Sequence, residues 1–165
     1  MSFLDLANER KSVRKYERKQ IEPEKVEAIL EAMRLAPSAR NNQFWHFTAV
    51  TDLDKVRDMA EKMGHSFALD ASCIIVVSYS NSCVMTNGHR NDSIDGSIAL
   101  TFGMLEATEL GLGSCWIASY KEDAVREMLG LPETDTIPAI LIVGYSAEDP
   151  VRRPRKPLSE VATII

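Results

Sequence analysis

A dense group of cations and one hydroxyl lies near the start of the chain, in the run Arg10-Lys11-Ser12-Val13-Arg14-Lys15-Tyr16. Arginine and lysine provide charge, and the serine hydroxyl provides a directional hydrogen bond, which together are what a phosphate group requires. The alternative is a solvated basic patch, which basic runs usually form. Phosphate binding is therefore a hypothesis for this run.

A second stretch is crowded with amides and hydroxyls. Between Leu35 and Phe47 the chain reads Leu-Ala-Pro-Ser-Ala-Arg-Asn-Asn-Gln-Phe-Trp-His-Phe. Amides can both donate and accept hydrogen bonds, so a loop of this kind, held between a helix and a strand, can bind the polar edge of a flat, heteroatom-rich ring. The alternative is an ordinary polar connection, because asparagine and serine are common in loops.

The histidines and cysteines give weaker signals. His46 is more often a structural residue than a catalyst at such a position, and Cys83 with His89 in a turn-like segment is a poor basis for a metal site. Cys73 and Cys115 lie in apolar runs and are expected to be buried free thiols. Without a CxxC pair, the usual zinc spacing is absent. No nucleophile–base pair is evident, which favours chemistry carried by a cofactor.

Composition limits the class of protein. The chain has 165 residues, of which 45% are hydrophobic and 26% charged, which is typical of one globular domain. A net charge of −5 argues against a general nucleic-acid binder. No apolar run approaches the roughly 20 residues that cross a bilayer, and the first residues lack the pattern of a signal peptide. We expect a cytoplasmic protein.

Hydrophobic periodicity predicts the elements that position these residues. Pro23 suits the first position of a helix, and Pro37 disfavours helical geometry in the residue before it. The run Cys73–Tyr79 is continuously apolar and β-branched, as in a strand covered on both faces. The predicted helices cover residues 3–9, 23–35, 53–63, 92–110 and 121–129, and the predicted strands cover 46–51, 73–79, 114–117 and 137–145.

The helix over residues 92–110 has apolar residues on more than one face, which predicts burial or contact with a partner chain and hence an oligomer. Asp92 or Ser93 is expected to cap its N-terminus. Trp116, in the strand that follows, is more often a core residue than a ligand contact. The strand ends in the small residues Ala118 and Ser119, which allow another group to approach the backbone closely.

Four blocks, taken in order, resemble the nitroreductase family of flavin enzymes. The resemblance covers nearly the whole chain, and it is the ordered set that makes it specific. The blocks are Arg-Lys-Ser-Val-Arg-Lys-Tyr, Ala-Pro-Ser-Ala-Arg-Asn-Asn-Gln-Phe-Trp-His-Phe, Glu-Leu-Gly-Leu-Gly-Ser-Cys-Trp-Ile at the end of the long helix, and Ile-Val-Gly-Tyr with the tail Arg-Arg-Pro-Arg-Lys-Pro-Leu.

The resemblance implies an α+β nitroreductase-like fold, with a central mixed or antiparallel sheet flanked by helices. It implies a single FMN-binding domain over residues 1–165 and an intertwined homodimer with FMN at the interface. It also implies roles for individual residues. The family positions that contact the flavin phosphate and ring edge match Arg10, Lys11, Ser12 and Arg14, and its C-terminal phosphate contacts match Arg153 and Arg155. The loop that reaches the flavin of the other subunit matches Pro37, Ser38, Ala39, Asn41 and Gln43. The strand end that faces the flavin N5 region through its backbone matches Ile117, Ala118 and Ser119.

The implied activity is that of an FMN-dependent oxidoreductase, which transfers hydride from NADH or NADPH through the flavin to an organic acceptor such as a nitroaromatic or a quinone, with ping-pong kinetics. No catalytic side chain is required for flavin chemistry. One alternative is an FMN-binding protein with a storage, sensing or regulatory role and little turnover. Another is a structural dimer that has lost FMN.

The chain departs from the family pattern at three positions. Phe44 stands where the family usually has proline, so the loop can turn differently and bring an aromatic ring near the pocket. Ala118 replaces an acidic residue that some members carry. Arg40 adds a cation to the loop, which favours an anionic substrate. The chain is also short for the family, with no long insertion to form a lid.

Overall fold

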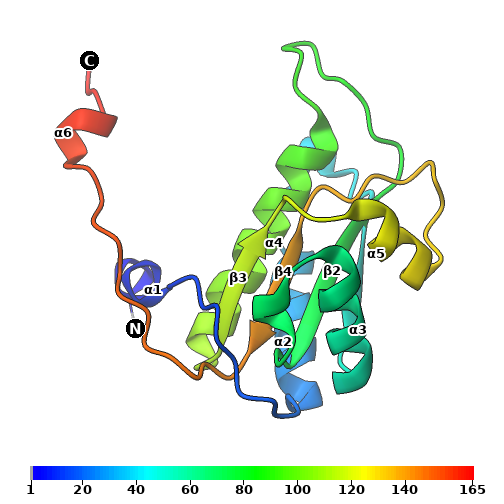
Figure 1. Ribbon diagram of the computed structural model, residues 1–165. Coiled ribbons are helices and arrows are strands. Elements are labelled where there is room, and N and C mark those ends of the chain that lie inside the picture. The colour runs from blue at the N-terminus through cyan, green and yellow to red at the C-terminus, as the bar shows by residue number, and fades with distance from the viewer. Residues whose placement is uncertain (1) are drawn as a thin grey trace.

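A four-stranded antiparallel sheet lies at the centre of the computed structural model, which describes residues 2–165 (Figure 1). Its two inner strands, β2 (Cys73–Tyr79) and β4 (Ile140–Gly144), bury every residue, which confirms the prediction that the run Cys73–Tyr79 is covered on both faces. In spatial order the strands are β1 (Trp45–Val50), β2 (Cys73–Tyr79), β4 (Ile140–Gly144) and β3 (Gly113–Ile117). The α+β class is confirmed, and the sheet is antiparallel throughout rather than mixed.

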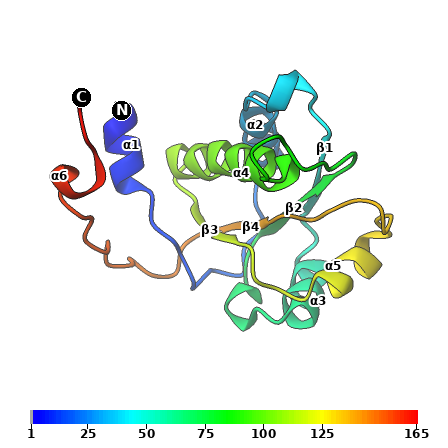
Figure 2. The same cartoon turned by 90° about the horizontal axis from the view of Figure 1, so that it is seen from above.

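Helices cover both faces of the sheet (Figure 2). One face carries α2 (Pro23–Arg34) and α4 (Asn91–Glu109), and α1 (Phe3–Glu9) lies beside α4. The opposite face carries α3 (Leu53–Met63) and α5 (Glu122–Leu129). Short 3-10 turns cover Ala39–Asn41 and Ser66–Ala68, and a last helix, α6 (Leu158–Val161), lies in the C-terminal tail.

Alternation along β2 builds two separate cores. Ile74 and Val76 are fully buried on the face of α3 and α5. Ile75 and Val77 are fully buried on the face of α2 and α4. Because successive strand residues point to opposite faces, the side chains from Cys73 to Val77 contribute alternately to one core and the other.

Local signals set most helix boundaries. Pro23 occupies the first turn of α2. The Asp52 carboxylate accepts hydrogen bonds from the backbone N–H groups of Asp54 and Lys55 at the start of α3. That helix ends at Gly64, whose φ of 88° is a left-handed conformation that glycine adopts without steric cost.

The start of α4 differs from the prediction. Its N-cap is Arg90, with no side-chain capping bond, rather than Asp92 or Ser93. The Asp92 carboxylate is instead only 2% exposed and bonded to Arg90 and Thr136 inside the fold. Its tertiary partners therefore outweigh the local capping preference.

Close packing between helices requires a small residue on α4. A Cβ atom added at Gly103 would lie 2.7 Å from Cγ of Met33 on α2. Ile94 and Phe102, on the outer surface of the same helix, remain 38% and 39% exposed. The predicted all-round burial of this helix is therefore incomplete within one chain.

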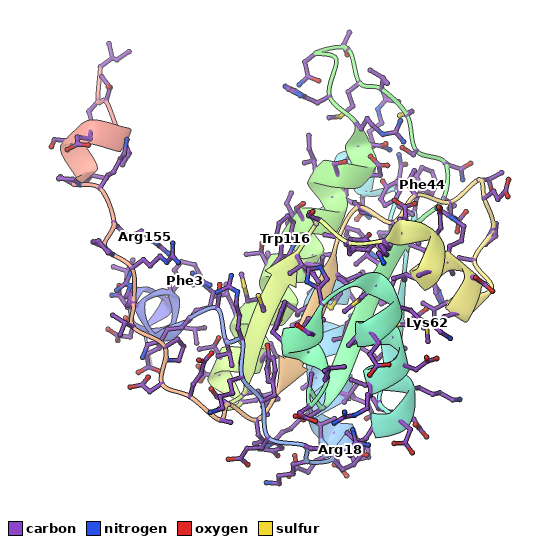
Figure 3. All side chains as sticks on the ribbon, in the orientation of Figure 1. Phe3, Arg18, Phe44, Lys62, Trp116 and Arg155 are labelled. Atoms are coloured by element: carbon purple, nitrogen blue, oxygen red, sulfur yellow. The ribbon has the colours of Figure 1, made fainter. Side chains whose placement is uncertain are left out.

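Two further expectations are corrected by the structure. The last strand covers only Ile140–Gly144, because Ile137 and Pro138 precede the ladder with β2 and β3. Trp116 is 37% exposed rather than a core residue. It alternates with Cys115 and Ile117, which pack into the core on the α3 and α5 side, so Trp116 points from the opposite face of an edge strand (Figure 3).

The C-terminal tail leaves the body of the protein and passes α1 (Figures 1 and 2). From residue 151 to 165 every residue is exposed, including several large apolar side chains, namely Val151, Leu158, Val161, Ile164 and Ile165. No helix within residues 2–165 has the length and apolar character needed to cross a membrane.

Candidate functional site

The two basic runs meet in one cavity. Its volume is about 550 Å³, and we call it the cationic cavity. The N-terminal run contributes the Ser12 hydroxyl as well as cations, and the C-terminal segment contributes three arginines together with Glu148, Pro150 and Val151. The cations that line it are Arg10, Lys11, Arg14, Arg152, Arg153 and Arg155.

The N-terminal wall of the cavity is fixed by the sheet. Ser12 forms a bridge with Ser114 of β3, and the backbone N–H of Val13 donates to the carbonyl of Ser114 at 2.9 Å. Arg10 Nη1 lies 3.8 Å from Sδ of Met104 on α4. These contacts hold the N-terminal run against the edge strand β3 and against α4.

The tail forms the opposite wall. Arg152 donates a hydrogen bond to the side-chain carbonyl of Asn8 on α1. Arg155 extends from the tail toward α1, near Phe3 (Figure 3). Burial lowers the pKa of Arg10, and the nearby charges of Arg155 and Arg152 lower it further. The arginines of the two chain ends are therefore close enough to repel each other.

Carboxylates neutralise only part of this charge. Lys11 Nζ lies 2.6 Å from Oδ1 of Asp149, and Glu148, which also lines the cavity, accepts from the backbone N–H of Arg14 at 2.6 Å. Within the described residues, none of the five arginines that line the cavity has a carboxylate within salt-bridge distance.

Such a donor set fits a phosphate monoester. Phosphate carries about −1.5 to −2 charges at pH 7 and accepts several hydrogen bonds. Arginine can bind two of its oxygens at once through the planar guanidinium group, and a serine hydroxyl adds a further donor. Cations that repel each other without carboxylate partners are stabilised when such an anion binds between them.

The amide-rich loop is strained. Arg40, Asn41 and Gln43 have positive φ angles of 54°, 57° and 51°. Asparagine tolerates this conformation, but arginine and glutamine rarely adopt it. Inside the loop, the Gln43 backbone N–H donates to the Ser38 hydroxyl at 3.1 Å, and the Gln43 side chain donates to the Asn41 carbonyl at 3.1 Å. Strained loops of this kind are common at ligand sites.

One contact anchors the loop to α4. The backbone N–H of Ala39 donates to both oxygens of the Asp95 carboxylate, at 3.1 Å each. Pro37 lies exposed just before this anchor. Phe44, just after the loop, packs edge-on against Tyr79 with ring centroids 6.2 Å apart. That contact directs the aromatic ring to the end of β2.

The end of β3 is held from the other side of the sheet. His65 forms a 2.7 Å hydrogen bond through Nε2 with the carbonyl of Ser119. Ile117 packs into the core, so its backbone rather than its side chain is available to a ligand. Ala118 is exposed and lines a smaller cavity of about 310 Å³ beside Asp92.

Within one chain the loop and the cationic cavity lie apart along α4. The loop is anchored at Asp95, whereas Arg10 contacts Met104, nine positions later. At about 1.5 Å per residue, these points are about 13 Å apart along the helix axis. The structure therefore brings the two basic runs together but does not bring residues 37–43 to them.

Several residues of the site were not predicted. Arg152 lies in the basic C-terminal tail, and nothing in the sequence pattern predicts its hydrogen bond to Asn8. Glu148 and Asp149 enter the cavity region only through tertiary structure. Asp95 had a possible signal, because it is an acidic residue on the same helical stripe as the buried Ala99.

Comparisons with known proteins agree with this architecture. The model of the nitroreductase family matches residues 7–68 and 60–145. A protein of Archaeoglobus fulgidus, named as a candidate NADH dehydrogenase/NAD(P)H nitroreductase, is 33% identical over 144 residues, which are 85% of this chain and 83% of that protein.

Solved structures give the same result. A nitroreductase family protein from Clostridium difficile 630 superposes with a TM-score of 0.88 at 31% identity, covering 99% of this chain and 98% of that one. A nitroreductase with bound FMN from Bacteroides fragilis superposes with a TM-score of 0.79 at 28% identity, covering 98% and 97%. The fold and the arrangement of the site define a flavin-type reductase scaffold. The chain belongs to the nitroreductase family.

Proposed function

We propose that this protein is an FMN-dependent oxidoreductase that takes hydride from NADH or NADPH and delivers it to an organic acceptor, such as a nitroaromatic or a quinone. The observation that carries the proposal is the cationic cavity, because it joins the two runs that match the phosphate contacts of the family. The FMN in the related structure from Bacteroides fragilis and the name of the relative from Archaeoglobus fulgidus support the same class of enzyme.

The residues of the chain have distinct roles in this proposal. Arg10, Ser12 and the tail arginines Arg153 and Arg155 bind the phosphate of FMN through charge-assisted hydrogen bonds. Bound FMN supplies the hydride chemistry, and the protein supplies orientation and electrostatics. Arg14 places positive charge near the ring edge, where it stabilises negative charge that develops on reduction.

Backbone groups complete the ring site. Ile117, Ala118 and Ser119 present main-chain donors to the N5 region, since the side chains of Ala118 and Ser119 are small and exposed. The strained loop, with Ser38, Asn41 and Gln43, provides amides and a hydroxyl for the polar ring edge. Reductant and acceptor use the same exposed ring face in turn, which predicts ping-pong kinetics. Double-reciprocal plots of initial rate against NAD(P)H concentration, at several fixed acceptor concentrations, are therefore expected to give parallel lines. Intersecting lines would argue for separate sites.

We propose that the ring site includes a second copy of the chain. One chain holds the loop and the cationic cavity about 13 Å apart along α4, and in this proposal the loop that reaches the ring comes from the partner. The exposed apolar residues of the tail, together with Ile94 and Phe102, support an intertwined homodimer. Obligate interfaces usually bury more than about 2,000 Å². Light scattering at micromolar concentration should give a dimer, and an FMN-loaded monomer would refute this assembly.

The test of the proposed function uses the purified chain with added FMN. We expect a yellow protein that, in the absence of oxygen, turns over NADH or NADPH only when a quinone or nitroaromatic is present. Bound FMN without turnover would instead indicate a storage, sensing or regulatory role. A colourless protein that does not bind FMN would reject both.

The acceptor is proposed to be anionic. Arg40 is exposed in the loop, and within the described residues no carboxylate pairs with it. A cation at this place favours negatively charged substrates. The ratio of kcat/KM for nitrobenzoate over nitrobenzene should be above one and should fall in Arg40→Gln. An unchanged ratio would remove this residue from substrate selection.

A further inference from the structure

A buried carboxylate on α4 is hydrogen-bonded to the strained loop. The Asp95 side chain is 2% exposed, and it accepts the Ala39 backbone N–H at 3.1 Å and the Tyr79 hydroxyl at 2.7 Å. Asn91, one turn earlier on the helix, donates its amide to the Tyr79 hydroxyl oxygen at 3.3 Å. Both oxygens of the carboxylate are thereby committed to donors on other elements.

The loop has no comparable second anchor. Among the described residues, the bonds between Ala39 and Asp95 are the only hydrogen bonds that join residues 37–43 to the rest of the chain. Three non-glycine residues of the loop have positive φ angles. Such conformations cost about 1–3 kcal/mol each in strained positions and persist only when surrounding contacts hold them. The anchor is therefore needed to keep the loop in the observed conformation.

Tyr79 orients the anchor. Its ring is fully buried at the end of β2, with Phe44 packed against it edge-on. A hydroxyl held by Asn91 can donate to only one acceptor, and that acceptor is Oδ2 of Asp95. The tyrosine thus fixes the rotation of the carboxylate, whose oxygens then face Ala39.

We propose that Asp95 is a positioning residue that preorganises the flavin-binding loop: it holds Ala39 so that Ser38, Asn41 and Gln43 present their polar groups in a fixed arrangement. This inference rests on the proposed function for the ligand of the loop, but its structural part does not. Preorganisation raises affinity because the ordering of the loop is completed before the ligand binds.

The chain supplies a matched control three residues away. Asp92 lies on the same helix, is also 2% exposed, and accepts hydrogen bonds from Arg90 at 3.0 Å and from the Ser93 backbone at 2.7 Å. Its other partner is Thr136, and none of these groups belongs to the loop. Asp92→Asn therefore repeats the chemical change of Asp95→Asn in the same polar cluster without altering an acceptor of the Ala39 amide.

The first measurement is hydrogen exchange at the Ala39 amide in the full chain, with and without FMN. Asp95→Asn keeps the shape of the side chain but removes its charge and one acceptor. We expect exchange at Ala39 to rise by about 10- to 100-fold, because a hydrogen bond to a charged acceptor changes an opening equilibrium by that factor. Asp92→Asn should leave exchange at Ala39 unchanged. Tyr79→Phe should give a smaller rise, since the bond to Ala39 remains.

The second measurement is FMN affinity, from the fluorescence change of flavin on binding. Asp95→Asn should weaken binding by about tenfold, and Asp92→Asn should not. Unchanged exchange at Ala39, unchanged FMN affinity, or equal effects of the two asparagine variants would each overturn the inference. A wild-type protein that does not bind FMN would overturn the proposed function instead, while the exchange comparison would still test the anchor.

Discussion

The two polar regions of this protein are built in opposite ways. One is the α4 polar cluster, formed by Tyr79, Asn91, Asp92, Asp95 and Thr136, in which each carboxylate has several donors within the chain. The other is the cationic cavity, whose arginines have no carboxylate partners among the described residues, and in which burial, together with the charges of Arg155 and Arg152, lowers the pKa of Arg10.

The difference separates residues that stabilise the fold from residues that await a ligand. A buried polar group that is fully bonded contributes to a unique structure, and removing one partner is costly. Cations that repel each other contribute nothing favourable until an anion arrives, which is the usual compromise between stability and function at binding sites. Mutation of the cluster should therefore lower stability, whereas mutation of the cavity should lower affinity.

The largest effect is expected from Asp95→Ala. The change leaves the buried Tyr79 hydroxyl and the half-buried Ala39 amide without an acceptor, at about 1–3 kcal/mol for each unsatisfied group. The free energy of unfolding should fall by about 2–5 kcal/mol, measured by urea denaturation of the chain without FMN. Asp54→Ala is the control, because that carboxylate is 92% exposed and its ion pair with Arg18 is worth less than about 1 kcal/mol. Equal losses in the two variants would break the comparison.

Next in size is the loss of FMN affinity in Arg10→Ala and in Arg155→Ala. Each change removes a charge-assisted hydrogen bond of about 1.5–3 kcal/mol, so the dissociation constant should rise by about 10- to 100-fold. Stability without FMN should stay constant or rise, because a repelling charge has gone. Arg18→Ala serves as the arginine control outside the cavity.

Riboflavin separates the phosphate from the ring in the same experiment. It lacks the phosphate, so its affinity should be unaffected by either cavity variant. If FMN and riboflavin weaken equally, the residue acts on the ring or on the fold. If FMN binds either variant as tightly as wild type, that arginine is not a phosphate ligand.

A moderate effect is expected on the acid side of the stability profile. Burial tends to raise the pKa of Asp92, but hydrogen bonds from Arg90 and Thr136 outweigh it and hold the pKa at about 2, below the ordinary 3.8. A depressed pKa contributes stability above the unfolded value, and that contribution is lost as the pH falls through the folded value. Asp92→Asn should therefore flatten the loss of stability between about pH 4 and pH 2 in urea titrations. An acid profile identical to that of wild type would contradict this assignment.

The smallest effect is expected on the reduction potential of bound FMN, and it concerns Lys11 and Arg14 of the N-terminal basic run. Both were predicted near the flavin, but Lys11 is already paired with Asp149 at 2.6 Å. Within the described residues, Arg14 has no such partner for its side chain. Arg14→Met should lower the reduction potential of bound FMN, and Lys11→Met should lower it less. Equal potentials in both variants and in wild type would remove both residues from the ring edge.

Much of the fold could be predicted from local patterns. The bounds of α3 and β2 coincide with those predicted at 53–63 and 73–79, because a capping aspartate, a terminal glycine and a continuous apolar run are local signals. The predicted family and the α+β class are confirmed. Cys73 and Cys115 are buried free thiols as expected, and burial raises the pKa of Cys73 to about 12.

The rest depended on contacts between distant residues. The predicted cap of α4 was wrong because Asp92 accepts a hydrogen bond from the distant Thr136, in addition to its neighbour Arg90, and periodicity does not mark Thr136 as a partner. Trp116 is exposed because β3 is an edge strand, which no sequence run reveals. The roles assigned to the flavin-contacting residues stay predictions, although the two basic runs do lie in one cavity.

The cationic cavity also constrains when the protein can acquire a ligand during its production. Arg10 and Ser12 leave the ribosome before Arg153 and Arg155, which follow more than about 140 residues later. With synthesis at about 5–20 residues per second, the second wall is missing for about 7 to 28 seconds after the first is made. A nascent chain can fold part of its sheet in that time, but it cannot yet surround a phosphate. Binding of the proposed cofactor between these two walls therefore requires synthesis at least as far as Arg155.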